Sequence, residues 1–264
     1  MKSKKLSIII PCYNEGNKIR KKLTELESFM HELVKESKIK PIIKTFEIIV
    51  LSDGAKDNTA SEVLAVAHKN KWIKPVINVE NHGKGFVIRQ GFEMADGEYI
   101  MFMDADLSVD INGIRKALLL QKQNPYAAII GSRKHPLTYI DGVDKWYRKI
   151  MSWVLNFITQ TVLPLKGVND TQCGFKMYPY QYAKFIVEKQ LMERFSFDLE
   201  HLLIMRQNGG KIVEMPIHYY KQDTSTVHPV RVTLRFLSDL KDIWDNYKYG
   251  HYKVTYERKD IECD

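Results

Sequence analysis

The segment MFMDADLS places two carboxylates, Asp104 and Asp106, at the end of an apolar run. An unpaired charge at the end of a buried strand is costly, so such a pair requires a partner. On a strand, residues two apart point to the same side, and both carboxylates would face one cation. Mg²⁺ is commonly held by one or two carboxylates together with substrate phosphates. The pair predicts a metal site; the alternative is two loop carboxylates that cap the next helix, although Asp110 is better placed for that cap.

Three further polar positions have both a functional and an ordinary explanation. The segment NHGKGFVIRQG surrounds Lys84 with glycines before a predicted helix, which suits an anion because glycine permits close approach and a helix N-terminus attracts negative charge. A plain strand-to-helix turn explains it equally well. Asp53 could accept a hydrogen bond from a nucleobase N–H, or stand in a turn. Arg133 could grip a phosphate with two hydrogen bonds, or be a solvated surface residue.

Alternating strand and helix patterns position these residues over the first 132 residues. The predicted strands are LSIIIPCY, which Pro11 stops, FEIIVLSDG, PVINVE, GEYIMFMDAD and YAAIIGSR. The predicted helices are residues 17–37, 57–70, 84–95 and 110–122. Strands separated by helices indicate βαβ units and a mainly parallel sheet, and continuous apolar strands indicate that both faces are covered.

In such a sheet, ligands bind beyond the carboxyl ends of the strands. The polar groups that follow the predicted strands are Tyr13-Asn14-Glu15, Asp53-Gly54, Asn81 to Gly85, Asp104 with Asp106, and Ser132-Arg133. One edge of the sheet thus gathers carboxylates, glycines and cations. This combination predicts a site for a nucleoside diphosphate with a metal.

The second half of the chain is less regular. Residues 143–163 mix aromatic and basic side chains as an amphipathic helix at a membrane interface would, with a core helix as the alternative. Helices are also predicted over 195–208 and 229–248, and the polar motif DTQCGFK lies between apolar helical stretches. We expect one domain over residues 1–249, with a nucleotide-binding half (1–132) and an acceptor-binding half (133–249), and a loose polar tail over 250–264.

The composition limits the classes of protein to which this chain can belong. The 264 residues are 44% hydrophobic and 27% charged, as in globular proteins, and the net charge of +8 favours phosphate-bearing partners. No nucleic-acid motif is present. Cys12, Cys173 and Cys263 lie far apart, which excludes a disulfide framework and fits a reducing cytosol. Without a run of about 18 apolar residues, the protein is expected to be soluble or peripheral.

The ordered motifs resemble those of family 2 glycosyltransferases. IIIPCYNE, SDGAKDNT, NHGKGFVIRQG, DADLS, IGSR, DTQCGFK and ERFSFDLE follow one another over residues 6–220. They look most like the dolichyl-phosphate β-glucosyltransferase branch, with the dolichyl-phosphate mannose synthases as close relatives. The resemblance implies a GT-A fold, an α/β three-layer sandwich with a mostly parallel central sheet.

The resemblance also implies an NDP-sugar donor, a divalent metal (Mg²⁺ or Mn²⁺) and roles for individual residues. By similarity, the nucleotide-sugar pocket comprises Pro11, Tyr13, Glu15, Asp53, Lys84, Asp104, Ala105 and Asp106. Asp104 and Asp106 are the expected metal ligands, Asp106 the firmer one, while Arg133 and Arg148 would hold an acceptor phosphate. Ser108 stands where the mannose synthases often have a glutamine ligand, and no lysine occurs near Thr224 to Val227, where the related enzymes usually have one.

The expected function is the inverting, metal-dependent transfer of a hexose, glucose from UDP-glucose above all, to a polyprenyl phosphate. The enzyme would act in the cytoplasm, peripherally at the inner face of the cell membrane. Alternatives are transfer from GDP-mannose, or a soluble family 2 enzyme that acts on a hydroxyl of a cell-surface glycan or polyol. The related glucosyltransferases usually carry an N-terminal membrane helix that this sequence lacks, which favours the soluble enzyme. A hydroxyl acceptor would need a carboxylate base, for which Asp170 is the candidate.

Overall fold

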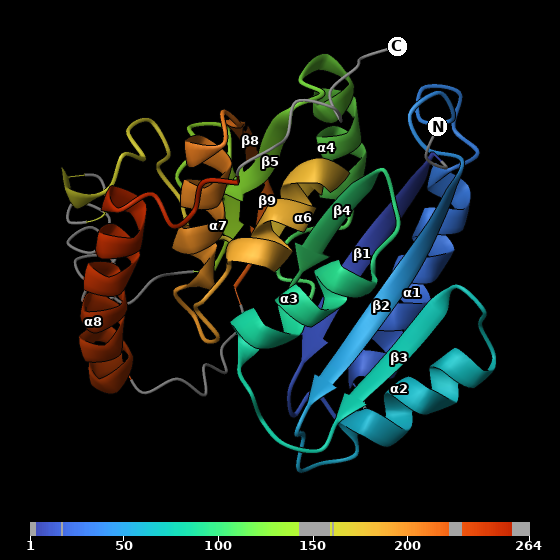
Figure 1. Ribbon diagram of the computed structural model, residues 1–264. Helices are drawn as coiled ribbons and strands as arrows, with labels where there is room; N and C mark the ends of the chain where they lie inside the picture. Colours follow the sequence, from blue (N-terminus) through green and yellow to red (C-terminus); the bar gives the residue numbers. More distant parts are fainter. Residues whose placement is uncertain (1–3, 17, 143–158, 160, 222–228, 255–264) are drawn as a thin grey trace.

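A seven-stranded sheet forms the centre of the computed structural model, which describes residues 4–16, 18–142, 159, 161–221 and 229–254 (Figure 1). Its strands run in the order β3-β2-β1-β4-β7-β5-β8. They are β1 (Lys5–Cys12), β2 (Thr45–Asp53), β3 (Ile73–Asn78), β4 (Tyr99–Met103), β5 (Ala127–Ser132), β7 (Phe175–Pro179) and β8 (Lys211–Pro216). A small second sheet pairs β6 (Tyr139–Asp141) with β9 (His218–Tyr220) in parallel.

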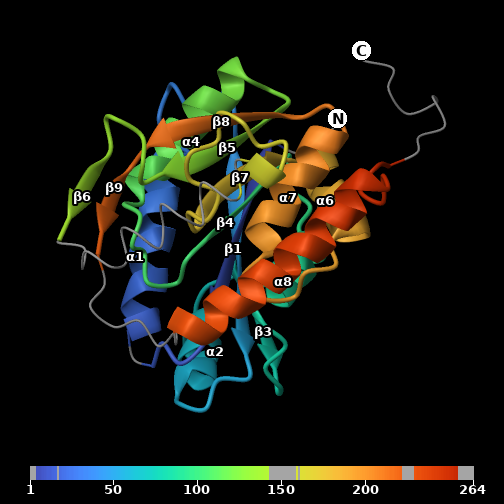
Figure 2. The same ribbon diagram turned by 90° about the vertical axis from the view of Figure 1, so that its left-hand side faces the viewer.

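Helices cover both faces of the large sheet and produce the expected three layers (Figure 2). They are α1 (Lys18–Leu33), α2 (Thr59–His68), α3 (Lys84–Met94), α4 (Asn112–Gln123), α6 (Tyr180–Lys189), α7 (Phe197–Gln207) and α8 (Pro229–Lys248). Apolar side chains of α1, α2 and α4 pack on one face, and those of α3, α6, α7 and α8 pack on the other. Successive strand residues alternate between the two cores, so that Ile8 and Ile10 face one core and Ile9 the other.

The sheet is parallel except at β7, which the sequence patterns did not predict. β7 runs antiparallel to both of its neighbours, β4 and β5, and Met103 pairs with Phe175. Because β7 runs in the opposite direction, its first residue lies at the edge where the parallel strands end. The motif DTQCGFK therefore enters the sheet at the edge where the parallel βαβ units present their ligand-binding loops.

Three predicted strand boundaries were wrong. β1 continues through Pro11 to Cys12. The pairing of β1 with β4 ends at Ile9, so Pro11, which lacks an N–H, lies beyond the part of β1 that is paired on that side and is tolerated there. β4 ends at Met103, which leaves Asp104 and Asp106 in a turn and removes the alternation argument that placed both carboxylates on one side. The segment KIVEMPIHYY, whose sequence predicts a single strand, divides into β8 and β9 at Ile217.

The tail after Tyr249 is also better ordered than expected. The Tyr252 side chain is fully buried, and its backbone oxygen accepts a hydrogen bond from Asn208 Nδ2 at 2.8 Å. Val254 N donates to Asn208 Oδ1 at 2.9 Å. The segment 249–254 is thus docked on the end of α7, while residues 255–264 lie outside the described part of the chain.

Two predictions about membrane contact have different outcomes. Most of the predicted amphipathic helix, residues 143–158 and 160, lies outside the described residues, so that prediction stands as it was. Among the helices that the structure describes, none has the length and apolar character needed to cross a bilayer.

Candidate active site

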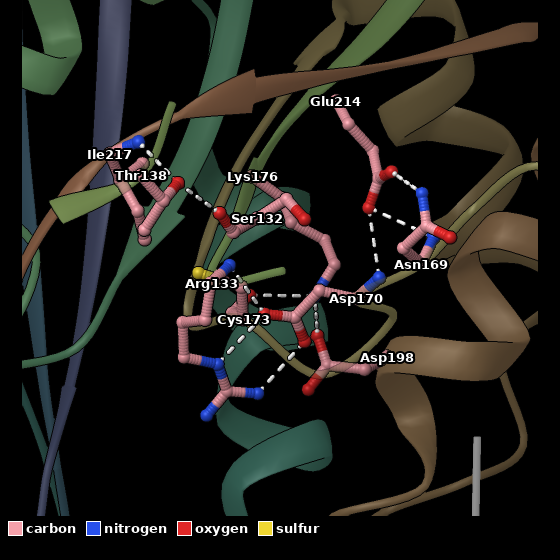
Figure 3. A network of polar contacts seen from close by, with 10 residues as sticks. All are labelled: Ser132, Arg133, Thr138, Asn169, Asp170, Cys173, Lys176, Asp198, Glu214 and Ile217. Carbon is pink, nitrogen blue, oxygen red and sulfur yellow. Dashed lines mark hydrogen bonds and ion pairs between the residues drawn. The ribbon is translucent and has the colours of Figure 1, made fainter. Parts of the chain in front are cut away.

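The carboxyl edge of the sheet brings together most of the residues that the sequence singled out. Asp104 follows β4, Arg133 follows β5, and the motif DTQCGFK leads into β7 between them. Figure 3 shows Arg133, Asp170, Cys173 and Lys176 around the start of β7. The charges of Arg133, Asp170, Lys176 and Asp104 all act on the buried thiol of Cys173, so the two halves of the candidate site meet at this motif.

Asp104 is held by a lysine and by a glycine. Lys84 Nζ lies 2.6 Å from Asp104 Oδ1, and the backbone N–H of Asp104 donates to Gly174 O at 3.1 Å. A Cβ atom at Gly174 would come within 2.0 Å of the Asp104 carboxylate, a distance that no side chain could occupy. Glycine in the DTQCGFK motif therefore leaves room for the carboxylate.

The Lys84 ammonium lies in an apolar and anionic surround. It is 6.0 Å from the Phe102 ring centre and 5.8 Å from that of Phe197, distances at which a cation gains from the aromatic face. Burial alone would lower the pKa of Lys84, but the carboxylates of Asp104 and Asp198 outweigh burial and raise it. Lys84 therefore stays charged beside Asp104.

Asp106 occupies a tight turn rather than a strand. Its Oδ1 accepts the backbone N–H of Ser108 at 2.9 Å, and Leu107 between them has a positive φ of 47°. Lys22 Nζ donates to the backbone oxygen of Asp106. Burial, reinforced by the charge of Asp106, raises the pKa of Glu15, so acidic groups from two loops act on one another here. Ser108 contributes its backbone to this turn and is itself buried.

The donor set at this turn suits a hard cation that is bound together with a substrate. Within the described residues, no three His, Cys, Asp or Glu side chains converge as a complete cage. Asp104 and Asp106 supply carboxylate oxygens, and burial together with the charge of Asp106 raises the pKa of the neighbouring Glu15. Mg²⁺ and similar ions commonly take one or two carboxylates and complete their shell with water and phosphate oxygens. The residues present therefore fit a metal that arrives with a diphosphate.

A second ion pair, buried more deeply than the partly exposed pair of Lys84 and Asp104, lies next to it. Lys176 on β7 is fully buried; its ammonium pairs with Asp198 at the start of α7 and donates to Cys173 O at 2.8 Å. Burial raises the pKa of Asp198, and the charges of Lys176 and Lys84 offset only part of that rise. Asp198 thus lies between two lysines, and the buried charges alternate in sign from Lys176 to Asp104. We call these four residues the charge quartet (Lys176, Asp198, Lys84 and Asp104).

Arg133 is fixed by a fork-shaped interaction with Asp170. Its Nε and Nη2 atoms each donate to a different carboxylate oxygen at 2.8 Å, and the Asp170 backbone N–H donates to Glu214 Oε1 at 2.8 Å (Figure 3). Burial would lower the pKa of Arg133, but Asp170 raises it well above its usual value. The Nη1 atom has no hydrogen-bond partner in the described part of the chain, so the guanidinium keeps N–H groups for an anion.

The same geometry weighs against Asp170 as a general base. Its side chain is almost entirely buried, and both oxygens are occupied by Arg133. Burial would raise the pKa of Asp170, but Arg133 outweighs burial and lowers it. A carboxylate of low pKa without a free, exposed oxygen is poorly suited to accept a proton from a hydroxyl.

Asp53 and the glycine-rich segment hydrogen-bond to each other, which favours the second of the two explanations that the sequence left open for each. The Asp53 carboxylate accepts hydrogen bonds from His82 N at 3.0 Å and Gly83 N at 2.8 Å. The amides of Gly85 and Phe86, at the start of α3, donate to backbone oxygens of residues 193 and 194. The chain's own backbone therefore occupies the helix terminus that the sequence suggested for a phosphate.

The other predicted site residues are distributed as follows. Tyr13 is exposed just after β1, and Pro11 lies inside β1. Ala105 is buried in the turn over residues 104–108, which we call the acidic turn. All three therefore lie at or near the carboxyl ends of β1 and β4. Arg148 lies outside the described residues, so its expected role as a phosphate ligand stays a prediction.

Sequence reasoning missed a buried polar cluster behind the site. Glu200 accepts the amides of Leu191 and Met192 at 2.9 and 2.8 Å, and the Tyr252 hydroxyl at 3.0 Å. Burial is the main reason that the pKa of Glu200 rises to about 7. The signal available in the sequence was a helix, α7, that is buried all round yet carries Asp198, Glu200 and His201.

The raised pKa of Glu200 predicts how pH acts on stability. Protonated Glu200 is favoured in the folded chain, so its contribution is complete below pH 4.5 and is lost as pH rises to about 7. Relative to Glu200→Gln, which stays neutral, the wild type should lose up to about 3 kcal/mol of unfolding free energy over that interval. Urea unfolding of both proteins from pH 4.5 to 8 measures this; a pH-independent difference between them would contradict the assignment.

Comparison with known proteins agrees with the geometry. The family model for glycosyl transferase family 2 matches residues 7–186. The dolichyl-phosphate β-glucosyltransferase of Dictyostelium discoideum is 30% identical over 94% of this chain and 76% of its own length, and that of Homo sapiens is 30% identical over 97% and 80%.

Solved structures share the fold at lower identity. Glucosyl-3-phosphoglycerate synthase from Mycobacterium tuberculosis, in complex with UDP, superimposes with a TM-score of 0.65 at 13% identity over 92% of this chain and 80% of its own. S. aureus TarS superimposes with a TM-score of 0.55 at 16% identity over 94% and 72%. With the GT-A architecture and the motif-bearing edge in place, the chain belongs to glycosyl transferase family 2, in the branch of the dolichyl-phosphate β-glucosyltransferases, and is an NDP-sugar-dependent hexosyltransferase.

Proposed function

We propose that this enzyme transfers glucose from UDP-glucose to a polyprenyl phosphate, with inversion at the anomeric carbon and with a divalent metal. The observation that carries the proposal is the arrangement of Arg133. Asp170 holds its guanidinium rigidly, yet Nη1 has no hydrogen-bond partner among the described residues. The Arg133 guanidinium lies 5.7 Å from the centre of the Tyr219 ring, and the charges of Arg133, Asp106 and Asp104 all act on the Tyr219 hydroxyl. An anionic acceptor can therefore approach the donor from the Arg133 side.

The donor half would bind the sugar nucleotide through the acidic turn. Asp104 and Asp106 would hold Mg²⁺ or Mn²⁺, which neutralises the diphosphate as it leaves. Lys84, charged and fixed beside Asp104, adds a second cation close to the leaving group. Tyr13, Glu15 and the Asp53 loop would enclose the nucleoside end of the donor site, as in the family pattern.

The acceptor half explains why no general base is needed. The second pKa of a phosphate monoester is about 6, so a polyprenyl phosphate is a nucleophile at neutral pH without losing a proton. Its phosphate oxygen forms a bond to the anomeric carbon as the bond from that carbon to the diphosphate oxygen breaks, which inverts the configuration. Arg133, joined by Arg148 in this proposal, positions the phosphate for the displacement. The occupied carboxylate of Asp170 speaks against the alternative with a hydroxyl acceptor.

A lipid acceptor requires contact with the membrane, and the chain exposes apolar side chains beside Arg133. Leu137 is 78% exposed, Tyr139 62% and Ile140 39%. They lie on or just before β6, whose partner β9 is bonded to the acidic turn through Tyr220 N and Ser108 O at 2.7 Å. Exposed aliphatic and tyrosine side chains of this kind suit a membrane interface. We place the enzyme peripherally at the cytoplasmic face of the membrane.

Transfer assays test the acceptor. With radiolabelled UDP-glucose, Mn²⁺ and polyprenyl phosphate, the wild type should form a glucosylated lipid. Arg133→Lys keeps the charge but loses the planar fork toward Asp170, so transfer should fall about 100-fold while UDP binding persists. The control is Arg115→Lys, because Arg115 lies on α4, away from the candidate site, and pairs with Glu36. Failure of the folded wild type to label any lipid from UDP-glucose or GDP-mannose would refute a polyprenyl phosphate acceptor.

Flotation with phosphatidylglycerol-containing vesicles tests the membrane surface. A variant with serine at Leu137, Tyr139 and Ile140 should bind vesicles at least about 10-fold more weakly, because each lost side chain removes apolar area from the bilayer. A matched control replaces Leu64, Val79 and Tyr126, which are comparably exposed elsewhere, and should float like the wild type. Equal flotation of the two triple variants would place the membrane contact on another surface.

A further inference from the structure

Residues 190–194 lie directly against the start of α3, and we call them the support segment. Glu193 O accepts the amide of Phe86 at 2.9 Å, and Arg194 O accepts that of Gly85 at 3.1 Å. A Cβ atom at Gly85 would meet Met192 O at 2.4 Å. The glycines that flank Lys84 are therefore required by a backbone contact within the chain. The position of the first turn of α3 depends on where this segment lies.

A buried glutamate sets the position of the support segment. The two oxygens of Glu200 accept the consecutive amides of Leu191 and Met192 at 2.9 and 2.8 Å. A carboxylate matches two adjacent N–H groups in a way that an apolar or singly accepting side chain does not. Because the Glu200 side chain is fully buried, loss of one acceptor there would leave an N–H that points into the interior without a partner.

Gln190 and His201 extend the same connection to α3. Gln190 Nε2 donates to Gly85 O and to Met192 O, both at 2.8 Å. Its Oε1 must then accept from His201 Nε2, which lies 2.8 Å away, so the neutral ring carries its proton on Nε2. His201 Nδ1 is left buried without a hydrogen-bond partner in the described chain. The hydrogen bond from Gln190 to Gly85 O is thus formed in a cluster that leaves His201 Nδ1 unpaired among the described residues.

The residue that this arrangement positions is Lys84. It is the first residue of α3, between the two glycines that contact the support segment, and its ammonium lies 2.6 Å from Asp104. We propose that Glu200 is a positioning residue of the donor site: it holds the support segment, which fixes the first turn of α3 and thereby the Lys84 ammonium beside Asp104. This inference rests on the proposed use of Lys84 toward the donor diphosphate.

A double-mutant cycle tests whether Glu200 acts through Lys84. UDP with Mn²⁺ is titrated into the wild type, Glu200→Gln, Lys84→Met and the double variant. Glutamine has one oxygen acceptor, so one of the two amides loses its partner, and we expect UDP affinity to fall about 10-fold. In the Lys84→Met background the same change should cost about 2-fold or less, because coupled residues are non-additive. Equal losses in both backgrounds would overturn the inference.

Tyr252→Phe is the matched control for general damage to the cluster. It removes one hydrogen bond to the same carboxylate but leaves both amide contacts of the support segment. UDP affinity should stay within about 2-fold of the wild type even where stability falls. A loss of affinity as large as that of Glu200→Gln would show that Glu200 has only a structural role.

Amide hydrogen exchange separates this inference from the proposed function, since it needs no ligand. Exchange at Gly85 and Phe86 should be faster in Glu200→Gln than in Tyr252→Phe, because only the former releases the support segment. Unchanged exchange at these two amides overturns the inference whatever the protein binds. A wild type that binds neither UDP nor GDP would instead defeat the proposed function, even with the expected exchange pattern.

Discussion

The site depends on four charges that must neutralise one another beneath the acidic turn. Lys176 is fully buried and pairs with Asp198, and Lys84 pairs with Asp104. A buried charge without its partner is strongly unfavourable, and breaking such a pair typically costs about 3–5 kcal/mol. The charge quartet therefore ties β4, β7, α3 and α7 into one arrangement. Asp104, the proposed metal ligand, is the last member of this chain of charges.

The antiparallel strand β7 makes this arrangement possible. Its reversed direction brings the motif DTQCGFK to the ligand-binding edge, where successive residues serve both halves of the site. Asp170 clamps Arg133, Gly174 leaves space for Asp104, and Lys176 reaches Asp198. The proposed donor and acceptor groups are thus both in contact with one segment, so a shift of β7 would alter both at once. Such coupling suits a reaction in which two anionic substrates must meet in line.

Much of the fold followed from the sequence because its patterns are local. Apolar runs separated by helical periodicity predicted the parallel strands and most of the helices, and strand ends predicted the edge that carries Asp104 and Arg133. Local patterns do not report strand direction, so β7 was missed. Local patterns also do not show which part of the chain approaches a glycine. The open space at Gly85 suited a phosphate or a plain turn, and the structure places Met192 O there, 2.4 Å from where a Cβ atom would lie. Tyr252 lies in a polar tail, and only its contact with Glu200 explains its burial.

We propose that the DTQCGFK motif builds the donor site around Asp104. Calorimetric titration of UDP with Mn²⁺ into the wild type and Gly174→Ala tests it most directly. The added methyl group would lie 2.0 Å from the Asp104 carboxylate and displace that flexible side chain from Lys84. We expect Gly174→Ala to fold and to bind UDP with Mn²⁺ at least about 10-fold more weakly than the wild type does. Wild-type affinity in folded Gly174→Ala would contradict it.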